Sequence, residues 1–449
     1  MCLFGCSKNL IDTEVTIGKF KKNNYTIVND PSKADIIVIN TCGFIETAKE
    51  EAINTILEMA EYKKDRCKYL IVMGCLVQRY YNDLIKLLPE VDLFIKIDEY
   101  INLWDKIKDL IENNSVEISK TNRRLSSFKQ IPMVDPESFY ERVVTTGKKY
   151  AYLKIGEGCS NNCTYCAIPY IRGKFISRKM EDIINEAKIL ANQGIEELII
   201  IAQDTTKYGV DIYGKTKLSK LLNELSKISK IKWIRFLYSY PEGITDELIE
   251  EVKNNKKIVK YFDIPIQHIS DELLKRMNRK TSKENIEKLI KKIRNKIPEV
   301  ILRTSIIVGF PGETNEQFLE LMDFINWAEF DKLGAFTYSK EEGTPAAKMP
   351  NQIHGNTKKS RYNKLMEKQQ KISIEKLNKK VGNVYETLIE DISFDGKYLI
   401  GRTINDVPDI DGIIYIKNDN KNEKLINTFV KCKINQVNGY DLIGEIINN

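Results

Sequence analysis

Histidine is scarce in this sequence: only His268 and His354 occur among 449 residues. Histidine is the usual acid–base group of nucleophilic catalysis and the commonest metal-binding side chain. So small a supply argues against a hydrolase built on a histidine and against a histidine-rich metal site. The G-x-S-x-G turn that presents the nucleophilic serine of α/β-hydrolases is also missing.

Long apolar runs are missing as well. The longest runs have the length of single strands and are Ile36–Asn40, Leu198–Ala202 and Ile306–Val308. A membrane-spanning helix needs about 20 consecutive apolar residues. The first residues also lack the basic stretch and apolar stretch of a signal peptide. The sequence therefore predicts no membrane span and a cytoplasmic location.

Composition is that of an ordinary globular protein. Charged residues make up 30% and hydrophobic residues 42% of the chain, which is enough apolar material for real cores. The length suggests two to four domains. The net charge of +7 is mild, and it does not by itself indicate a nucleic-acid partner.

The nine cysteines are more informative, because a reducing cytosol favours metal ligands over disulfides. Cys159, Cys163 and Cys166 form a C-x3-C-x2-C motif directly after the apolar run 152–155. Three thiolates so close together can hold three irons of a 4Fe-4S cluster, and with no fourth cysteine nearby one iron stays open. The alternative is a zinc knot, but zinc sites favour paired C-x2-4-C spacings and a fourth Cys or His.

A second set of three cysteines lies in the first quarter of the chain. Cys6, Cys42 and Cys75 each follow a strand-like run directly, in a turn-prone context with glycine. The carboxyl ends of parallel strands share one edge of a sheet, so these thiols are expected to meet there. The alternative is that small thiols are simply common near cores. The other cysteines are read as ordinary thiols: Cys2, Cys67 and Cys432.

The pattern of elements predicts an α/β protein of several domains. Residues 1–116 alternate strand and helix signals and predict a parallel sheet flanked by helices. Residues 117–147 are polar, irregular and rich in Lys and Arg, and are read as a linker. Residues 381–449 combine short strands with Gly, Asn and Asp turns and predict a small all-β barrel.

The central region, 148–378, contains six strand-like runs separated by helical segments. Such repetition predicts an incomplete parallel (β/α)6 barrel, with its functional groups at the carboxyl ends of the strands. The C-x3-C-x2-C motif follows the first run, as this arrangement requires. The six runs are 151–156, 197–203, 233–239, 261–267, 300–308 and 332–338.

Taken together, the chain resembles the radical S-adenosylmethionine (SAM) methylthiotransferases over its whole length. Longer strings resemble the RimO branch of that family, which modifies protein S-twelve of the small ribosomal subunit. Family members usually carry more residues before the first cysteine, so either the sheet has a clipped edge or this start is not the biological one. The strings are Gly5-Cys6-Ser7-Lys8-Asn9-Leu10 with Asp12 and Glu14, Asn40-Thr41-Cys42-Gly43-Phe44-Ile45, Ala202-Gln203-Asp204-Thr205 with Tyr208-Gly209 and Asp211, and Tyr338-Ser339-Lys340-Glu341-Glu342-Gly343-Thr344-Pro345.

The resemblance implies three domains and two clusters. The N-terminal domain would hold an auxiliary 4Fe-4S cluster, the central radical SAM barrel would bind a second cluster and SAM, and the last barrel would be a TRAM domain. The metal ligands would be Cys6, Cys42, Cys75, Cys159, Cys163 and Cys166. The SAM contacts would be Tyr165 at the adenine, then Gln203, Asp204, Arg303 and Ser305 at the methionine part or ribose.

The activity implied is the addition of a methylthio group to the β-carbon of an aspartate of ribosomal protein S-twelve. A small flavodoxin or ferredoxin would supply electrons. Cleavage of SAM gives a 5′-deoxyadenosyl radical, which removes a hydrogen that no protein base can take as a proton. One alternative is a methylthiotransferase acting on transfer-RNA adenosine, and another is a non-catalytic RNA- or ribosome-binding module with structural clusters.

The charge of the last domain favours the protein substrate. Residues 382–449 contain eleven acidic and seven basic side chains, a net charge of −4. An RNA-binding barrel needs positive charge to neutralise phosphates, whereas an acidic barrel attracts a basic ribosomal protein. Nucleic acid is therefore not the expected substrate.

Overall fold

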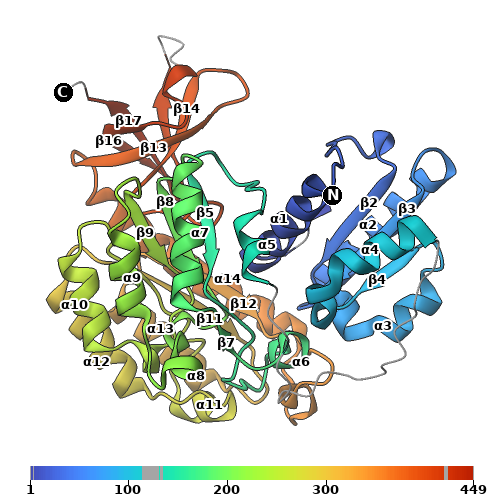
Figure 1. The fold of residues 1–449 in the computed structure, drawn as a ribbon. Coiled ribbons are helices and arrows are strands. Elements are labelled where there is room, and N and C mark those ends of the chain that lie inside the picture. Colours follow the sequence, from blue (N-terminus) through green and yellow to red (C-terminus); the bar gives the residue numbers. More distant parts are fainter. Residues whose placement is uncertain (1, 4, 114–130, 132–134, 419–422, 448–449) are drawn as a thin grey trace.

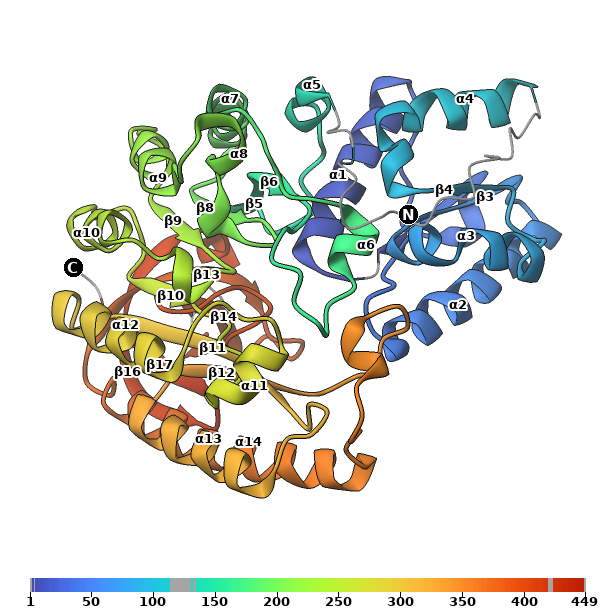
Figure 2. The same cartoon turned by 90° about the horizontal axis from the view of Figure 1, so that it is seen from below.

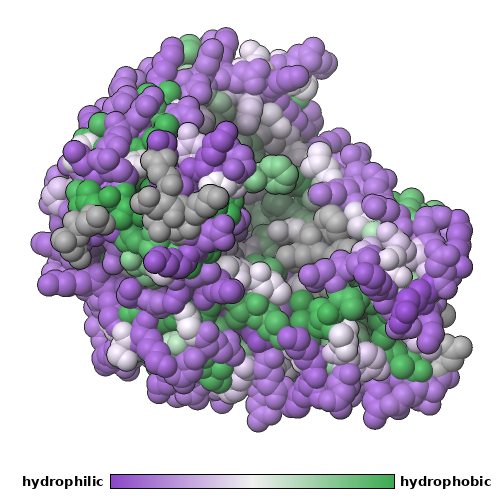
Figure 3. Space-filling model, turned by 90° about the horizontal axis from the view of Figure 1, so that it is seen from above, coloured by the Kyte–Doolittle hydropathy of each residue, from purple (hydrophilic) through white to green (hydrophobic). Residues whose placement is uncertain are grey.

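Three domains follow one another along the chain in the computed structural model (Figure 1). The structure describes residues 2–3, 5–113, 131, 135–418 and 423–447. Within these ranges, no helix combines the length and the apolar character needed to cross a lipid bilayer. Seen from above, the surface is mostly hydrophilic and is hollowed between a larger and a smaller lobe (Figure 3).

The N-terminal domain is a four-stranded parallel sheet with helices on both sides, as predicted. The sheet order is β1-β2-β3-β4. Burial of nearly every residue of β2 and β3 explains their continuous apolar sequences, because helices cover both faces. The elements are β1 (Cys2–Leu3), α1 (Ser7–Lys22), β2 (Ile36–Thr41), α2 (Glu46–Ala60), β3 (Tyr69–Gly74), α3 (Cys75–Leu87), β4 (Leu93–Ile95) and α4 (Leu103–Asn113).

The central domain contains all six predicted strands in parallel order. They form two three-stranded sheets, β5-β8-β9 and β10-β11-β12, which an isolated bridge between Ile234 and Ile258 brings side by side. The strands are β5 (Tyr150–Lys154), β8 (Glu197–Ile201), β9 (Trp233–Phe236), β10 (Tyr261–Asp263), β11 (Ile301–Val308) and β12 (Lys332–Thr337). The result is the incomplete barrel that the sequence predicts.

Helices cover the outside of this barrel (Figure 2). The start of α13 carries a capping box: Thr314 Oγ1 accepts a hydrogen bond from Gln317 N, and Thr314 N donates one to Gln317 Oε1. The long helices are α7 (Met180–Asn192), α9 (Leu218–Ser226), α10 (Asp246–Asn254), α12 (Lys283–Lys296), α13 (Asn315–Ala328) and α14 (Gly355–Asn378). The shorter elements are β6 (Gly156–Glu157), α6 (Ile168–Arg172), β7 (Ile176–Ser177), α8 (Val210–Tyr213) and α11 (Asp271–Arg276).

The C-terminal domain is a closed five-stranded barrel, as predicted, with the order β13-β14-β15-β17-β16. It lies at the amino ends of the central strands, away from α6 (Figure 1). Asp406 pairs with Lys332 across 2.8 Å, and Glu386 accepts a hydrogen bond of 2.9 Å from Trp233 Nε1. The strands are β13 (Val384–Ile392), β14 (Tyr398–Thr403), β15 (Ile414–Lys417), β16 (Phe429–Asn438) and β17 (Asp441–Ile446).

The predicted linker, 117–147, falls largely outside the described residues. Its described end is packed rather than loose: α5 (Pro136–Tyr140) is followed by Arg142, whose buried guanidinium pairs with Glu14 of α1 and Glu186 of α7 at 3.0 and 3.1 Å. This end of the segment therefore ties α1 to the central barrel.

Candidate active site between two cysteine triads

The barrel triad, Cys159, Cys163 and Cys166, lies in the loop between β6 and α6. The loop is closed on itself, because Cys159 N donates to Gly173 O at 3.0 Å and Cys166 N to Cys163 O at 3.0 Å. Gly158 precedes the first cysteine with φ +78°, and a Cβ there would lie 2.2 Å from Lys174 O. Only glycine fits this approach of two backbone segments.

The thiols of the barrel triad are buried next to one another. Burial raises the pKa of Cys159 to about 12, and the neighbouring Cys163 adds to the increase. Burial likewise raises the pKa of Cys166 well above its usual value, with contributions from Cys163 and Cys159. Thiolates at these positions need positive charge, which a bound metal cluster supplies when it displaces the protons. The donor set thus fits a thiolate-ligated cluster.

The N-terminal triad assembles at the carboxyl edge of the first sheet, as predicted. Cys6 caps α1, Cys42 follows β2, and Cys75 begins α3. Gly5 shows how close the segments come, since a Cβ there would lie 3.1 Å from Cys42 Cβ. Burial raises the pKa of the Cys75 thiol to about 12, while the Arg172 charge opposes this increase and the other two cysteines reinforce it. These three thiols too are neighbours, and the buried Cys75 needs a nearby cation to ionise.

Single metal ions fit neither triad. Among the residues with described positions, no three His, Cys, Asp or Glu side chains form a group that could hold one ion. A zinc ion would need thiolate sulfurs about 2.3 Å from one centre. A cluster spreads its ligands over several irons and therefore does not require three thiolates around one centre.

A buried network of charges joins the two triads. Arg172 closes α6, the helix that begins two residues after Cys166, and its guanidinium reaches Cys75 Sγ at 3.6 Å, Asp12 at 3.1 Å and Glu157 at 2.9 Å. Figure 2 shows α6 lying between the barrel and α3. Because buried charges persist only when paired, this network fixes the two domains relative to each other.

Lys154, the last residue of β5, completes this network. Its ammonium pairs with Asp12 and, at 3.1 Å, with Glu157. Burial opposes ionisation of Glu157, but the charges of Arg172 and Lys154 outweigh it and hold the pKa of that carboxyl well below its usual range. The charges of two cations, Lys154 and Arg172, are thus neutralised by two carboxylates, Asp12 and Glu157.

Gln203 and Asp204 lie beside the barrel triad, at the end of β8. Gln203 Nε2 donates to Glu157 Oε1 at 2.7 Å, and Gln203 Oε1 is buried without a partner among the residues that the structure describes. The Asp204 carboxylate accepts from Asn161 Nδ2 at 2.7 Å and from Thr206 N at 3.1 Å. Since Asn161 lies inside the cysteine loop, Asp204 braces that loop, while Gln203 keeps one acceptor free for a ligand.

Tyr165 packs below the barrel triad against an apolar cluster that includes Met277 and Phe310. Burial raises the pKa of its phenol well above the usual value, and Cys163 and Cys166 contribute to the increase. The ring therefore lies at the triad, on its apolar side.

Arg303 and Ser305 lie on β11, inside the central barrel. Arg303 Nη1 pairs with Asp263 at 2.8 Å and lines a cavity of about 320 Å³ with residues of α14 and the C-terminal barrel. Ser305 lies two residues farther toward the carboxyl end. No contact found in the described ranges links Arg303 to the barrel cysteines.

Two residues that the sequence does not single out also border the barrel triad. Tyr240 OH lies 3.7 Å from Cys163 Sγ. Arg279 stacks on Tyr240, with its guanidinium carbon 4.1 Å from the ring centroid. In the described part of the chain, its Nε and Nη1 are buried without a hydrogen-bond partner. Arg279 follows α11 and carries no motif, so only the folded structure reveals it.

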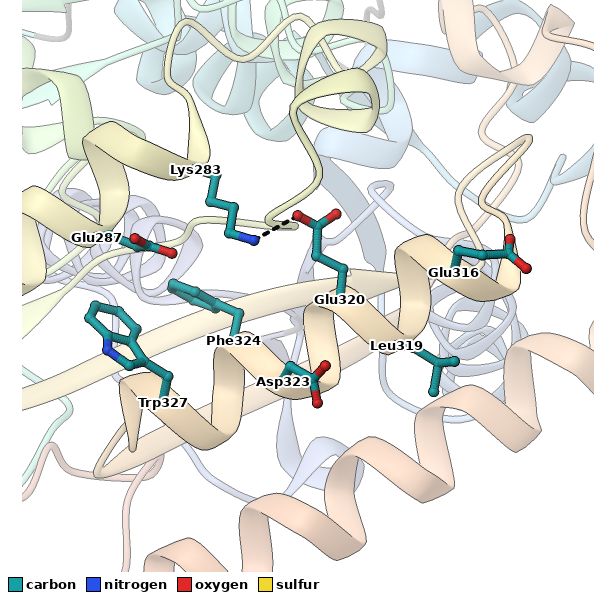
Figure 4. Close-up of a pocket in the computed structure, with 8 residues that line it drawn as sticks. All are labelled: Lys283, Glu287, Glu316, Leu319, Glu320, Asp323, Phe324 and Trp327. Carbon is teal, nitrogen blue, oxygen red and sulfur yellow. Dashed lines mark hydrogen bonds and ion pairs between the residues drawn. The ribbon is translucent and has the colours of Figure 1, made fainter.

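A separate groove lies on the outer helices α12 and α13 (Figure 4). Lys283 and Glu320 cross it in an ion pair of 2.8 Å, and Leu319 and Trp327 remain 53% and 39% exposed. None of its lining residues belongs to either triad. The groove is therefore not part of this site.

Family descriptions match three separate parts of the chain. Residues 153–325 match the radical SAM superfamily, residues 1–96 match an uncharacterized protein family, UPF0004, and residues 381–447 match the TRAM domain. These matches coincide with the central barrel, the first domain and the closed C-terminal barrel.

Curated relatives match over nearly the whole chain. The "ribosomal protein uS12 methylthiotransferase RimO" of Alkaliphilus oremlandii is 59% identical over 98% of this chain and 97% of its own. The protein of the same name from Acetivibrio thermocellus is 49% identical over 99% of this chain and 97% of its own.

Among solved structures, the radical SAM methyltransferase TsrM of Kitasatospora setae has a similar fold. In the form with cobalamin and a [4Fe-4S] cluster it has a TM-score of 0.55, 14% identity, and coverage of 76% of this chain and 74% of its own. In the form with tryptophan and a SAM analogue the TM-score is 0.53, with 13% identity and coverage of 74% and 70%. At this identity the likeness concerns the fold alone.

Proposed function

The chain belongs to the radical SAM methylthiotransferases that act on ribosomal protein uS12, and on this premise we propose that it modifies the β-carbon of an aspartate with the help of two 4Fe-4S clusters. The observation that carries the proposal is the pair of cysteine triads joined by Arg172. Each triad offers three thiolates and leaves one iron without a protein ligand. Purely structural clusters normally have four protein thiolates, so two sets of three argue against a purely structural role.

The division of labour follows the position of the triads. Cys159, Cys163 and Cys166, at the carboxyl ends of the barrel strands, hold the SAM-binding cluster. The N-terminal triad holds the auxiliary cluster. When bound, these groups supply a 5′-deoxyadenosyl radical that removes a hydrogen atom from an unactivated carbon and the sulfur that replaces it, the methyl group coming from a second SAM.

The surrounding side chains orient the reactants and exclude water. With the described residues alone, Gln203 keeps a free buried acceptor and Arg279 keeps unpaired N–H groups beside the barrel triad, and both are assigned to SAM. Tyr165 supplies an apolar face next to the same cysteines, suited to the adenine. Asp204 acts on SAM only through the loop that it braces. Ser305 is assigned to the ribose or methionine part from its position on β11, and Arg303 supports the site through Asp263.

Recruitment of the basic ribosomal protein by the acidic TRAM barrel is the finer part of the proposal. Its net charge of −4 supports a basic protein partner over RNA. Four of its acidic side chains face the central barrel, however, where they contact Trp233, Lys332, Tyr150 and Tyr261. The charge left to attract the substrate is therefore smaller than the count of −4, because seven other acidic side chains remain beside seven basic ones. Electrons come from a flavodoxin- or ferredoxin-type donor.

Mass spectrometry of the products tests the proposal. The anaerobically reconstituted full-length protein is given SAM, sulfide and a reductant, with a peptide of the uS12 loop in one tube and transfer RNA in another. The proposal predicts that one methylthio group replaces one hydrogen on the aspartate of the peptide. A gain on RNA adenosine alone would assign the chain to the transfer-RNA enzymes.

A further inference from the structure

Among the described residues, Lys8 is a buried cation without an anionic partner. The residue is only 7% exposed, and Nζ lies 3.0 Å from the centroid of the Tyr238 ring. In the part of the chain that the structure describes, its ammonium has neither an ion pair nor a hydrogen bond. A buried lysine is normally paired with an anion. The face of the Tyr238 ring does not neutralise the Lys8 charge, so the ammonium can still bind an anion from outside the protein.

Lys8 lies beside the N-terminal triad and reaches the carboxyl end of the central barrel. It is the second residue of α1, two positions after Cys6, and Tyr238 follows the carboxyl end of β9. The neighbouring Ser7 Oγ is also buried and has no hydrogen-bond partner within the described ranges. An unpaired ammonium and an unpaired hydroxyl therefore adjoin the N-terminal triad where α1 meets the barrel.

The Tyr238 ring beneath Lys8 is held in place. Tyr238 has φ +61°, a left-handed conformation that is rare for an aromatic residue and persists only where its surroundings fix it. Its N–H donates to Asp263 Oδ2 at 2.9 Å, and its carbonyl accepts from Thr205 N at 3.1 Å. Asp263 is in turn paired with Arg303. The position of the Lys8 ammonium is thus set by the barrel.

The other cations of the site are engaged differently. Arg172 and Lys154 are neutralised by Asp12 and Glu157. Arg279 has free N–H groups, but it borders Cys163 of the barrel triad. In the described ranges, Lys8 is the cation next to the N-terminal triad that lacks a carboxylate.

We infer that Lys8 binds the side-chain carboxylate of the substrate aspartate, an inference that rests on the proposed function. The carboxylate is bonded directly to the β-carbon, so a fixed ammonium that holds the carboxylate also fixes the β-carbon between the triads. A charge-assisted hydrogen bond distinguishes aspartate from asparagine, because the neutral amide offers no charge. Lys8 is therefore a specificity-determining residue.

Peptide binding to the reconstituted full-length protein tests this role. Fluorescence anisotropy measures the affinity for two labelled uS12-loop peptides, one with the target aspartate and one with asparagine in its place. The wild type is expected to prefer the aspartate peptide. Lys8→Met should weaken binding of that peptide about tenfold or more, without the same loss for the asparagine peptide. Lys8→Arg should retain most of the preference.

Lys21→Met, which removes an exposed charge from the same helix, serves as the matched control and should keep the wild-type preference. Equal weakening of both peptides by Lys8→Met, no weakening of either, or a wild type that does not distinguish them would overturn the inference. Slower SAM cleavage by Lys8→Met in the absence of peptide would assign Lys8 to SAM instead and would also overturn it. Failure of the proposed function would give a different result, because the wild type would then modify no uS12 peptide at all.

Discussion

Arg172 of the central barrel donates a hydrogen bond to Cys75 Sγ of the N-terminal domain across 3.6 Å. The same guanidinium pairs with Asp12 of α1 and Glu157 of the barrel. Since α6 begins two residues after Cys166, one short helix connects the last cysteine of the barrel triad to a cysteine of the N-terminal triad. The positions of the two triads therefore depend on each other.

Arg172→Gln should weaken both the fold and the auxiliary site. Removing one partner of a buried charge network costs about 3–5 kcal/mol, and the N-terminal triad would lose the cation that lies 3.6 Å from Cys75 Sγ. We expect a lower unfolding temperature, less iron after reconstitution and a more negative reduction potential of the auxiliary cluster. Thermal unfolding and potentiometric EPR measure these effects.

Arg172→Lys provides the comparison, because it keeps the charge but loses the fork that reaches three partners at once. Compared with Arg172→Gln, this variant should bring the reduction potential of the auxiliary cluster part of the way back to the wild-type value. It should restore a smaller part of the lost stability. An unchanged potential in Arg172→Gln would show that Arg172 acts only as a structural link between the domains.

Gly158→Ala should prevent assembly of the barrel cluster while leaving the N-terminal triad intact. The added Cβ would lie 2.2 Å from Lys174 O, in a backbone with φ +78°. The loop that carries the three cysteines must therefore open. Iron analysis should show a content close to that of one cluster, and SAM cleavage should be lost.

Gly194→Ala separates backbone strain from steric clash. Gly194 has φ +98°, but a Cβ there meets nothing within 4 Å. This variant should keep both clusters and lose only about 1 kcal/mol of stability. Equal iron contents in the two variants would refute the close packing described for the cysteine loop.

Asp406→Asn should make the junction of the TRAM and central barrels less stable in a pH-dependent way. Although burial opposes its ionisation, Lys332 and Lys380 lower the pKa of Asp406 from 3.8 to about 2. A carboxyl whose pKa is lower in the folded state stabilises the fold above its unfolded pKa, and the contribution disappears as the pH falls toward the folded pKa. The difference of about two pKa units corresponds to roughly 2–3 kcal/mol.

Urea unfolding of wild type and Asp406→Asn measures this contribution. The stability gap should be constant between pH 7 and pH 5, and it should narrow below pH 4. As a control, Asp395→Asn changes an exposed carboxyl of a surface turn and should leave a much smaller gap. A gap that widened at low pH would contradict the assignment of Lys332 and Lys380 as partners of Asp406.

Much of the fold follows from local sequence. The six barrel strands and the parallel N-terminal sheet are visible as apolar runs separated by helical periods. Convergence of Cys6, Cys42 and Cys75 could be predicted because parallel strands end at a common edge. This reasoning needs only the position of each cysteine relative to its own strand.

The contacts between domains could not be predicted. Lys8 over Tyr238 and Arg172 at Cys75 join residues more than 90 positions apart, and no local pattern encodes such docking. Arg303 illustrates a similar limit: strand periodicity predicts which face it occupies, but not that Asp263 takes up its charge. The net charge of the TRAM barrel could be counted from the sequence. The sequence could not show that several of its acidic side chains are buried against the central barrel.

The most direct test of the central claim separates the two triads by mutation. Cys163→Ala and Cys42→Ala are assayed together with Cys67→Ala, a buried cysteine outside both triads, for SAM cleavage and for methylthiolation of the uS12 peptide. The account predicts that Cys163→Ala loses both activities, that Cys42→Ala cleaves SAM without forming the methylthio product, and that Cys67→Ala retains both. Intact methylthiolation by Cys42→Ala would contradict the two-cluster account.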